Sequence, residues 1–278
     1  MLTTTVDGLW ALQVLTGIEI LAPELGFRPI LPSVETPPLA LAHPIAAELR
    51  AAGVIDESGT VDATVVEWLT VLARRDVGLV IQVRTPDTRE SPATAIMARF
   101  AQWWVIMERS ADVVRITGAG TSTAEGTASA AIAGQIERLC GSNTSAPLRP
   151  VTLDADALLS GVTNEKTLRT FLSSQRLDGD QLQMIMMAAD PRRSAQASIV
   201  ALQSGVETGR PTRTQIEQSV VTIMDTPEGR LVAEHLPSAG KQWMVVAPGT
   251  ASNIAAAVNR MMRRLPANEE WYSYRKVV

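Results

Sequence analysis

The feature that most constrains the fold is an order of patterns that occurs twice along the chain. Helical periodicity comes first, then several runs with a period of two residues, and then one closing helical segment. Strands joined by short turns pair antiparallel, because a parallel pair needs a long crossover. The sequence of 278 residues therefore predicts an α+β fold, in which helices flank a mostly antiparallel sheet, with two halves at about 1–145 and 146–278.

The first half contains two clear helical patterns before its strands and one after them. The apolar positions of the strands alternate, except near Trp103 and Trp104, where apolar residues are continuous. We expect both tryptophans to lie under helices; the alternative is that one of them faces a partner. The predicted helices are 43–53, 62–76 and 122–141, the predicted strands are 77–84, 98–110 and 112–117, and a loop with two prolines is predicted at 85–96.

The second half repeats this order with different residues. Short helical patterns precede four strands, and an amphipathic helix follows them and ends at Pro266. Across both halves we expect Leu79, Trp104, Val221 and Val245 to be core residues. The predicted helices are 155–161, 165–174 and 178–190, and the predicted strands are 195–204, 215–225, 230–236 and 242–248.

Composition excludes several classes of protein. The net charge is −4 and the pI is about 5.4, whereas a nucleic-acid-binding domain usually has a basic face. One cysteine, Cys140, allows no intrachain disulfide, which fits a reducing compartment. The first residues lack a basic segment and a cleavage site, and no apolar run is long enough for a membrane helix. We expect a cytoplasmic protein without nucleic acid or membrane insertion.

Two glycine turns resemble phosphate-binding loops. Gly249 lies between a strand and a helix, but the turn has a single glycine and no nearby lysine, so helix capping by Thr250 or Ser252 is favoured. Gly118 and Gly120 also lie between a strand and a helix, but Thr123 occupies the third glycine position of a dinucleotide motif. A small-molecule-binding or regulatory protein that uses these turns remains the alternative function.

Catalytic and metal sites have little support in the sequence. The chain has two histidines, His43 and His235, and Cys140 lies near a predicted helix end. Acidic pairs near residues 154 and 178 occur where helices begin, so capping accounts for them. We therefore expect no catalytic residues, no cofactor and no metal, and we rank a hydrolase third among the functions.

Three strings, in order along the chain, resemble one family. They are a helix followed by G-V-I-D and G-T-V-D over Gly53–Trp68, D-T-P-E-G-R at Asp225–Arg230, and P-G-T with an amphipathic helix, L-P and W over Pro248–Trp271. Together they are similar to the EspG family, the cytosolic chaperones of mycobacterial type VII (ESX) secretion. The resemblance implies one domain over 1–278, with a central sheet between two helical bundles and quasi-twofold halves.

The resemblance also implies a function. Such proteins bind the helical tip of a PE–PPE heterodimer through its PPE subunit, keep the pair soluble and deliver it for export, and we expect a monomer or weak homodimer. The implied contact surface comprises Thr85–Met97, the strand region Gln203–Thr214 and the closing helices. The expected contact residues are Arg84, Asp87, Arg89, Glu90, Met97, Gln203, Arg210, Thr212 and Thr214.

Overall fold

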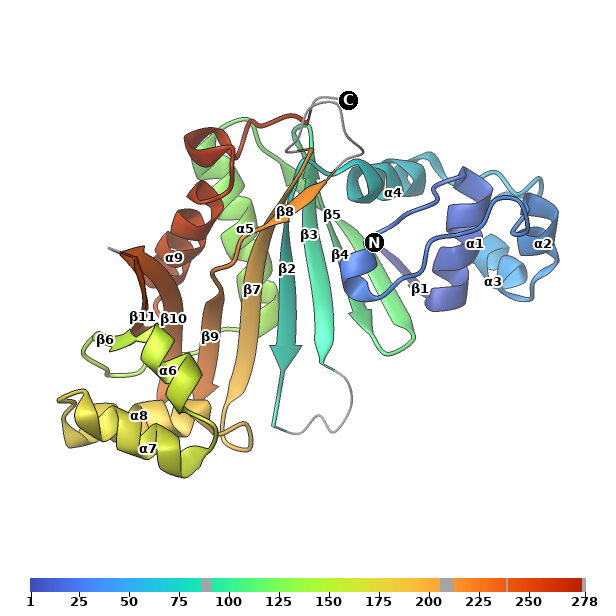
Figure 1. The fold of residues 1–278 in the computed structure, drawn as a ribbon. Coiled ribbons are helices and arrows are strands. Elements are labelled where there is room, and N and C mark those ends of the chain that lie inside the picture. The colour runs from blue at the N-terminus through green and yellow to red at the C-terminus, as the bar shows by residue number, and fades with distance from the viewer. Residues whose placement is uncertain (87–91, 206–212, 239, 277–278) are drawn as a thin grey trace.

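The structure is a computed structural model that describes residues 1–86, 92–205, 213–238 and 240–276. One large sheet runs through the molecule with helices against both faces (Figure 1), so the expected α+β fold is confirmed. The elements of the first half are β1 (Leu2–Thr5), α1 (Val6–Thr16), the 3₁₀ turn η1 (Pro23–Leu25), α2 (Pro37–Ala42), α3 (Ile45–Ala51), α4 (Ala63–Arg74), β2 (Val77–Arg84), β3 (Ala93–Phe100), β4 (Trp103–Ser110), β5 (Val113–Thr121) and α5 (Glu125–Cys140).

The second half has the same order of elements. It opens with a short strand, continues with a group of helices and a series of strands, and closes with one long helix. These elements are β6 (Val151–Asp154), α6 (Ala155–Gly161), α7 (Glu165–Ser174), α8 (Gly179–Ala189), β7 (Ala195–Ser204), β8 (Thr214–Ile216), β9 (Val221–Thr226), β10 (Gly229–Ser238), β11 (Lys241–Pro248), α9 (Ala251–Arg263) and the 3₁₀ turn η2 (Asn268–Glu270).

The strand order is β1-β5-β4-β3-β2-β7-β9-β10-β11-β6, with β8 paired to β7 beside this path. Pairings between these strands are antiparallel throughout the described residues. The central pair, β2 and β7, runs in register from Val77 opposite Gln203 to Arg84 opposite Gln196. From this pair outward, each half adds its later strands in turn and ends with its own first strand. The order is therefore the same in both halves when it is read from the centre.

Helices α5 and α9 cover one face of the sheet, which we call the two-helix face. Leu79, Ile81, Ile199 and Val221 point to this face and are fully buried against the cluster that contains both helices. On α9, Thr250 caps the first turn by accepting from the backbone N–H of Asn253. The apolar stripe of α9 is buried, as its helical spacing predicts.

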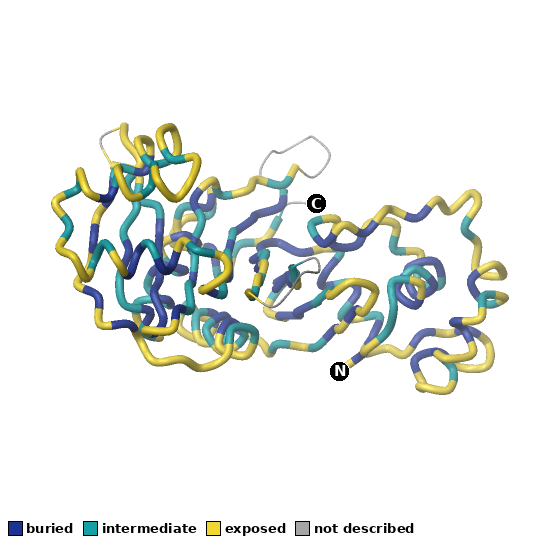
Figure 2. Tube along the Cα trace, turned by 90° about the horizontal axis from the view of Figure 1, so that it is seen from below, coloured by how far each residue is buried: buried dark blue, intermediate teal, exposed yellow. Residues whose placement is uncertain are grey.

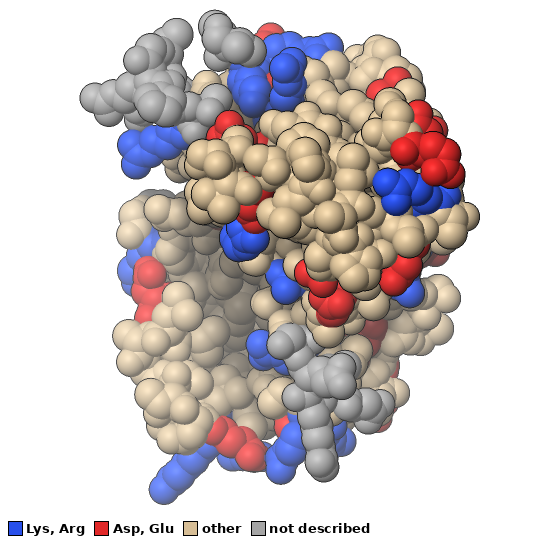
Figure 3. Space-filling view, turned by 90° about the vertical axis from the view of Figure 1, so that its right-hand side faces the viewer, with Lys and Arg blue, Asp and Glu red and all other residues tan. Residues whose placement is uncertain are grey.

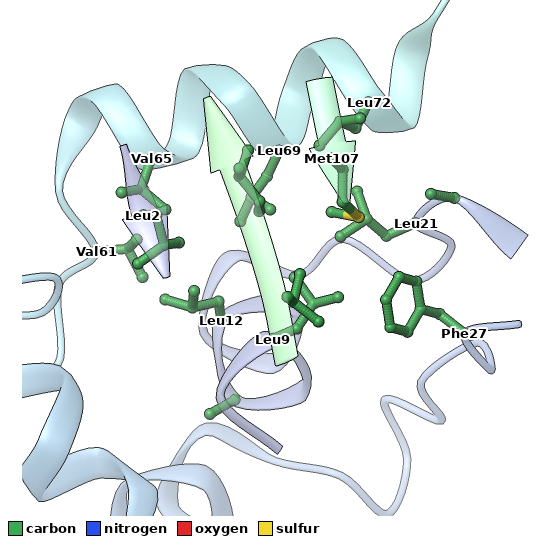
Figure 4. Packing of buried hydrophobic residues seen from close by; sticks show 14 of the residues in the cluster. Leu2, Leu9, Leu12, Leu21, Phe27, Val61, Val65, Leu69, Leu72 and Met107 are labelled. Atoms are coloured by element: carbon green, nitrogen blue, oxygen red, sulfur yellow. The ribbon is translucent and has the colours of Figure 1, made fainter. Parts of the chain in front are cut away.

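The opposite face, which we call the bundle face, is covered at its two ends by separate groups of helices. The N-terminal bundle, α1–α4, packs on β3, β4 and β5 (Figure 4), where Leu69 of α4 and Leu9 and Leu12 of α1 are fully buried. Asp62 caps α4 by accepting from the N–H groups of Thr64 and Val65. The C-terminal bundle, α6–α8, packs on β9, β10, β11 and β6. Figure 2 shows exposed turns at both outer ends and buried residues along the sheet.

Several sequence-based boundaries were wrong in the first half. The predicted loop at 85–96 and strand at 98–110 contain a hairpin of two strands, β3 and β4, because Ala101 takes the left-handed conformation (φ 62°) without a glycine to mark the turn. The expectation that both tryptophans are covered was also wrong: Trp104 is 1% exposed and Trp103 is 53% exposed. Strand β1 and helix α1, which precede the first predicted helix, were missed.

The expected core residues largely lie in the core. Leu79, Trp104 and Val221 are buried, and Trp104 donates from its indole N–H to the hydroxyl of Ser122 at 2.7 Å. Val245 is half-buried, because it lies on β11 near the outer edge of the sheet, where the helices of the two-helix face cover less of it.

Candidate partner-binding surface

The centre of the bundle face is open between the two helical bundles. On the central strands β2, β7 and β9, every second residue points to this face; several of these residues are half-buried or exposed, whereas others, such as Leu202 and Thr226, are buried there. Their neighbours on the same strands are fully buried on the two-helix face. We call the open set the central strip; its residues are Val80, Gln82, Ser198, Val200 and Thr222.

The surface beside the N-terminal bundle is hollowed rather than flat (Figure 3), with uncharged residues over most of that bundle. At one end of the strip, β8 pairs with β7 and places Ile216 opposite Leu202, with Ile216 55% exposed. At the other end, Arg84 closes β2 and is exposed opposite Gln196.

An apolar pocket continues the central strip under the C-terminal bundle. Its volume is about 120 Å³, and all its lining side chains are apolar, among them Leu158, Leu168, Met224 and Met244. Met224 lies two residues beyond Thr222 on the same face of β9, so the pocket adjoins the strip. A dry apolar cavity of about 150 Å³ is large enough for a benzene-sized group, so this pocket matches one apolar side chain in size.

A larger depression of about 860 Å³ lies between α7, α8 and the turn that leads into β7. Met186 and Met187 contribute apolar surface, and charged side chains of the same region pair with one another at its rim. Arg192 lies 3.1 Å from Asp190, and the hydrogen bond from Arg192 lowers the pKa of that carboxyl. An apolar floor with a charged rim is the usual anatomy of a protein-binding surface.

The expected contact residues that the structure describes fall into two groups. Arg84 is exposed and Thr214, on β8, is half-buried, and both border the central strip. Met97 and Gln203 instead point to the two-helix face and are buried, and the side-chain oxygen of Gln203 accepts from the N–H of Ala267 at 2.9 Å. The implied contact loop Thr85–Met97 ends inside β3, so Met97 lies in a strand rather than in a surface loop.

The other expected contact residues lie outside the described residues: Asp87, Arg89, Glu90, Arg210 and Thr212. The sequence patterns did not predict the central strip or the apolar pocket. The period of two in 77–84 and 195–204 was the available signal, since it shows which residues share a face, but it does not show which face stays open.

The glycine turns are accounted for by packing. A Cβ atom on Gly249 would lie 2.8 Å from the carbonyl carbon of Arg230, so only glycine fits there without a shift. Thr250 caps α9, as capping rather than phosphate binding predicted. Gly120 has φ of 99°, a backbone conformation that favours glycine, and Gly118 packs against the indole of Trp68.

The candidate reactive groups lie in unreactive surroundings. Burial raises the pKa of the Cys140 thiol, which makes it a poorer nucleophile at neutral pH. Burial, followed by the charge of Arg264, lowers the pKa of His235. His43 accepts from the N–H of Ile45 and packs edge-on against Trp10. Among the described residues, no three potential ligands come together as a metal site.

Comparison with known proteins decides the family. The family model described as "ESX-1_EspG: EspG family" matches residues 5–260. The chain belongs to the EspG family.

Relatives within this EspG family match over the whole chain. The ESX-2 secretion-associated protein EspG2 of Mycobacterium tuberculosis (strain H37Rv) is 53% identical over 278 residues, which is 100% of both chains. The ESX-5 secretion-associated protein EspG5 of Mycobacterium marinum is 23% identical over 303 residues, which is 99% of this chain and 97% of that protein.

A solved EspG structure has the same fold. It is the Mycobacterium tuberculosis type VII secretion system chaperone EspG5 in complex with a PE25–PPE41 dimer, with a TM-score of 0.78, 20% identity, and coverage of 98% of this chain and 99% of that one. The chain is therefore a member of a secretion-associated, non-enzymatic family. In the part of the chain that the structure describes, the helices are all too short or too polar to cross a membrane.

The EspG-like string Asp225–Arg230 has a structural role in this chain. The guanidinium of Arg230 is buried, donates twice to Asp225 at 2.7 Å and donates at 2.8 Å to the carbonyls of Cys140 and Gly141. It thereby satisfies the free carbonyls at the end of α5 and ties that helix to β10. The carbonyl of Arg230 also accepts from Gly249, so two of the three family strings meet here.

Proposed function

We propose that this EspG-family chain is a cytosolic chaperone that binds the helical tip of a cognate PE–PPE heterodimer through its PPE subunit. It keeps the pair soluble and delivers it to an ESX type VII secretion system. The observation that carries the proposal is the open central strip with an apolar pocket beside it. The fold shared with the EspG5 chaperone, which was solved with a PE25–PPE41 dimer, supports the choice of partner.

The chemistry of this surface suits a helical tip with apolar side chains. An apolar tip exposed before export would aggregate, and covering it requires a concave, partly apolar surface. Val80 and Val200 would cover apolar area along the strip, and the pocket lined by Leu168 and Met224 would hold one anchoring side chain. Gln82 and Ser198 offer polar groups to the backbone and polar residues of the tip.

The contact set follows from this placement. Arg84 and Thr214 stay in it because they border the strip, and Val200, Met224 and Leu168 join it. Met97 and Gln203 leave it because their side chains are buried on the other face. The resemblance keeps the remaining expected contacts in the proposal: Asp87, Arg89, Glu90, Arg210 and Thr212.

The identity of the relatives favours one secretion system. The chain is 53% identical over its full length to a protein named for ESX-2, against 23% for proteins named for ESX-5. We therefore propose that it serves an ESX-2-type system. We also propose that it acts as a monomer or weak homodimer and forms one domain of two pseudo-repeat halves, about 1–145 and 146–278.

The test is co-expression with candidate PE–PPE pairs, followed by size exclusion with light scattering. We expect one pair to co-elute with the chain as a 1:1:1 complex. Val200→Asp should abolish co-elution, because it places a charge in the strip. Val113→Asp is the matched control, since Val113 is 41% exposed on β5 and points to the two-helix face. Failure of every pair to bind, or equal loss in both variants, contradicts the proposal.

A further inference from the structure

The segment after α9 makes specific contacts with the sheet. From Ala267 to Lys276 it leaves α9 and reaches the end of the sheet where β2 begins and β8 lies (Figure 1). Trp271 is fully buried against the cluster of the two-helix face. Specific hydrogen bonds hold this irregular segment in place, and the role of these contacts needs an explanation.

Two buried charged side chains, Arg99 on β3 and Asp76 just before β2, form hydrogen bonds with the backbone of this segment. Arg99 of β3 donates through its two terminal nitrogens to the carbonyls of Tyr272 and Tyr274. Asp76 accepts from the N–H of Lys276 at 3.0 Å and from that of Ala101 at 2.9 Å. Arg99 and Asp76 are each 1% exposed and lie 4.0 Å apart.

In this arrangement the charged groups of Arg99 and Asp76 are both shielded from water. Burial lowers the pKa of Arg99 to about 10, against the opposing effect of Asp76, and the Nε atom of Arg99 has no hydrogen-bond partner among the described residues. Buried ion pairs add little net stability over apolar packing, because desolvation offsets their attraction. The placement of the segment therefore calls for a role besides stability.

The segment forms hydrogen bonds with three consecutive residues at the end of β7, Gln203–Gly205. The Tyr274 hydroxyl lies 2.9 Å from the carbonyl oxygen of Ser204 and 3.0 Å from that of Gly205. The side chain of Gln203 accepts from Ala267. Gly205 has φ of 73°, and a Cβ atom there would lie 2.5 Å from the Cβ of Lys276, so only glycine permits this approach.

These three residues connect the central strip to β8. Ser204 pairs with Thr214 and Leu202 pairs with the exposed Ile216, so the end of β7 sets where β8 lies at the border of the strip. The N–H of Gly205 donates to the carbonyl of Arg213 at 3.1 Å, which extends the pairing of β7 with β8 by one residue.

We propose that Ala267–Lys276 is a positioning strap that fixes the end of β7 and thereby places β8 and Ile216 for the partner. Tyr274 is its positioning residue, since its hydroxyl bridges the strap to Ser204 and Gly205. The role in partner binding rests on the proposed function. The mechanical role, holding β7 and β8 together, does not.

The first experiment measures hydrogen exchange of the free, full-length protein. Tyr274→Phe removes the hydroxyl and keeps the ring, so we expect about two- to tenfold faster exchange at the amides of Leu202–Gly205 and Thr214–Ile216, the effect of one hydrogen bond on local opening. Tyr272→Phe is the matched control, because the Tyr272 hydroxyl has no hydrogen bond within the described residues. Unchanged exchange in Tyr274→Phe overturns the strap.

The second experiment measures affinity for a PE–PPE pair that co-elutes with the wild-type chain. Tyr274→Phe should weaken binding about two- to tenfold, with melting temperature unchanged within about 2 °C, whereas Tyr272→Phe should bind like wild type. Faster exchange without weaker binding overturns the positioning role, because β8 then does not contribute to the partner surface. If the wild-type chain binds no pair, the proposed function fails, and the exchange comparison alone decides whether the segment is a strap.

Discussion

The two helical bundles occupy equivalent places on the sheet but differ in how completely they are packed. The N-terminal bundle buries Leu9 and Leu12 of α1 against β3–β5, and Leu69 and Leu72 of α4 have no exposed surface. In the C-terminal bundle Leu172 is fully buried, while Leu168, Leu182 and Met186 remain half-buried beside open pockets.

The difference teaches where a binding surface comes from in this fold. Apolar side chains that meet one another inside a bundle stabilise the chain and leave nothing for a partner. Apolar side chains that remain half-buried next to a concave surface stabilise the chain less and are available to a partner. The C-terminal bundle and the central strip both contain such half-buried apolar side chains.

The largest expected effect comes from a pair of matched leucine truncations. Leu69→Ala in α4 should lower the free energy of unfolding by about 2–5 kcal/mol, because it leaves a cavity in a closed core. Leu168→Ala in α7 should lower it by less than about 1.5 kcal/mol, because that side chain is half-buried beside an existing pocket. Denaturant unfolding measures both values. Equal losses would remove the difference between the bundles.

A pair of glycine substitutions tests the same contrast at the backbone. Gly59, between α3 and α4, has φ of 87°, and an added Cβ would lie 2.7 Å from Leu41, so Gly59→Ala should destabilise the protein by about 1–3 kcal/mol. Gly179, at the start of α8, has open space around it, so Gly179→Ala should stabilise by about 0.4–1 kcal/mol. Opposite signs in thermal melts support the comparison, and a shared sign contradicts it.

The smallest expected effect is a pH dependence in the N-terminal half. Glu35 accepts from the guanidinium of Arg28, the N–H of Leu31 and the indole N–H of Trp10, and these bonds lower its pKa to about 2. A lowered carboxyl pKa stabilises the fold fully above the unfolded value of about 4.3, and this contribution is lost as the pH falls toward 2.

The measurement is acid unfolding of the wild type and of Glu35→Gln. The variant should be less stable at pH 7 and should lose less stability between pH 4.5 and pH 2 than the wild type. Glu165→Gln in the C-terminal bundle is the control, since Glu165 is exposed and lies 3.9 Å from Arg169; it should match the wild type in this range. An identical acid profile for Glu35→Gln would show that these hydrogen bonds do not form in solution.

Much of the secondary structure was predictable from local patterns. Strand 195–204 and the helices 155–161 and 165–174 have the predicted bounds, because alternation and capping residues act within a few positions. The third and fourth strands were merged because the turn at Ala101 has no glycine or asparagine. The short β1 and the evenly apolar α1 were missed, since four residues give little periodicity and a helix that is apolar on several sides has no clear stripe.

The candidate surface was predictable only in part. Of the expected contact residues, Arg84 and Thr214 border the central strip, whereas Met97 and Gln203 point to the opposite face. Val80 and Leu79 are adjacent and similarly apolar, yet Leu79 is core and Val80 belongs to the strip. Nothing in either residue distinguishes these roles.

The sequence by itself determined the order of elements, the antiparallel sheet, the caps and the residues that share each strand face, because these depend on local conformation and on a period of two. Only the tertiary structure decided which face α5 and α9 cover, where the bundles leave the sheet open, and that the segment Ala267–Lys276 contacts the end of β7. These features depend on contacts between residues far apart in the sequence, such as Tyr274 and Ser204, and no local pattern records them.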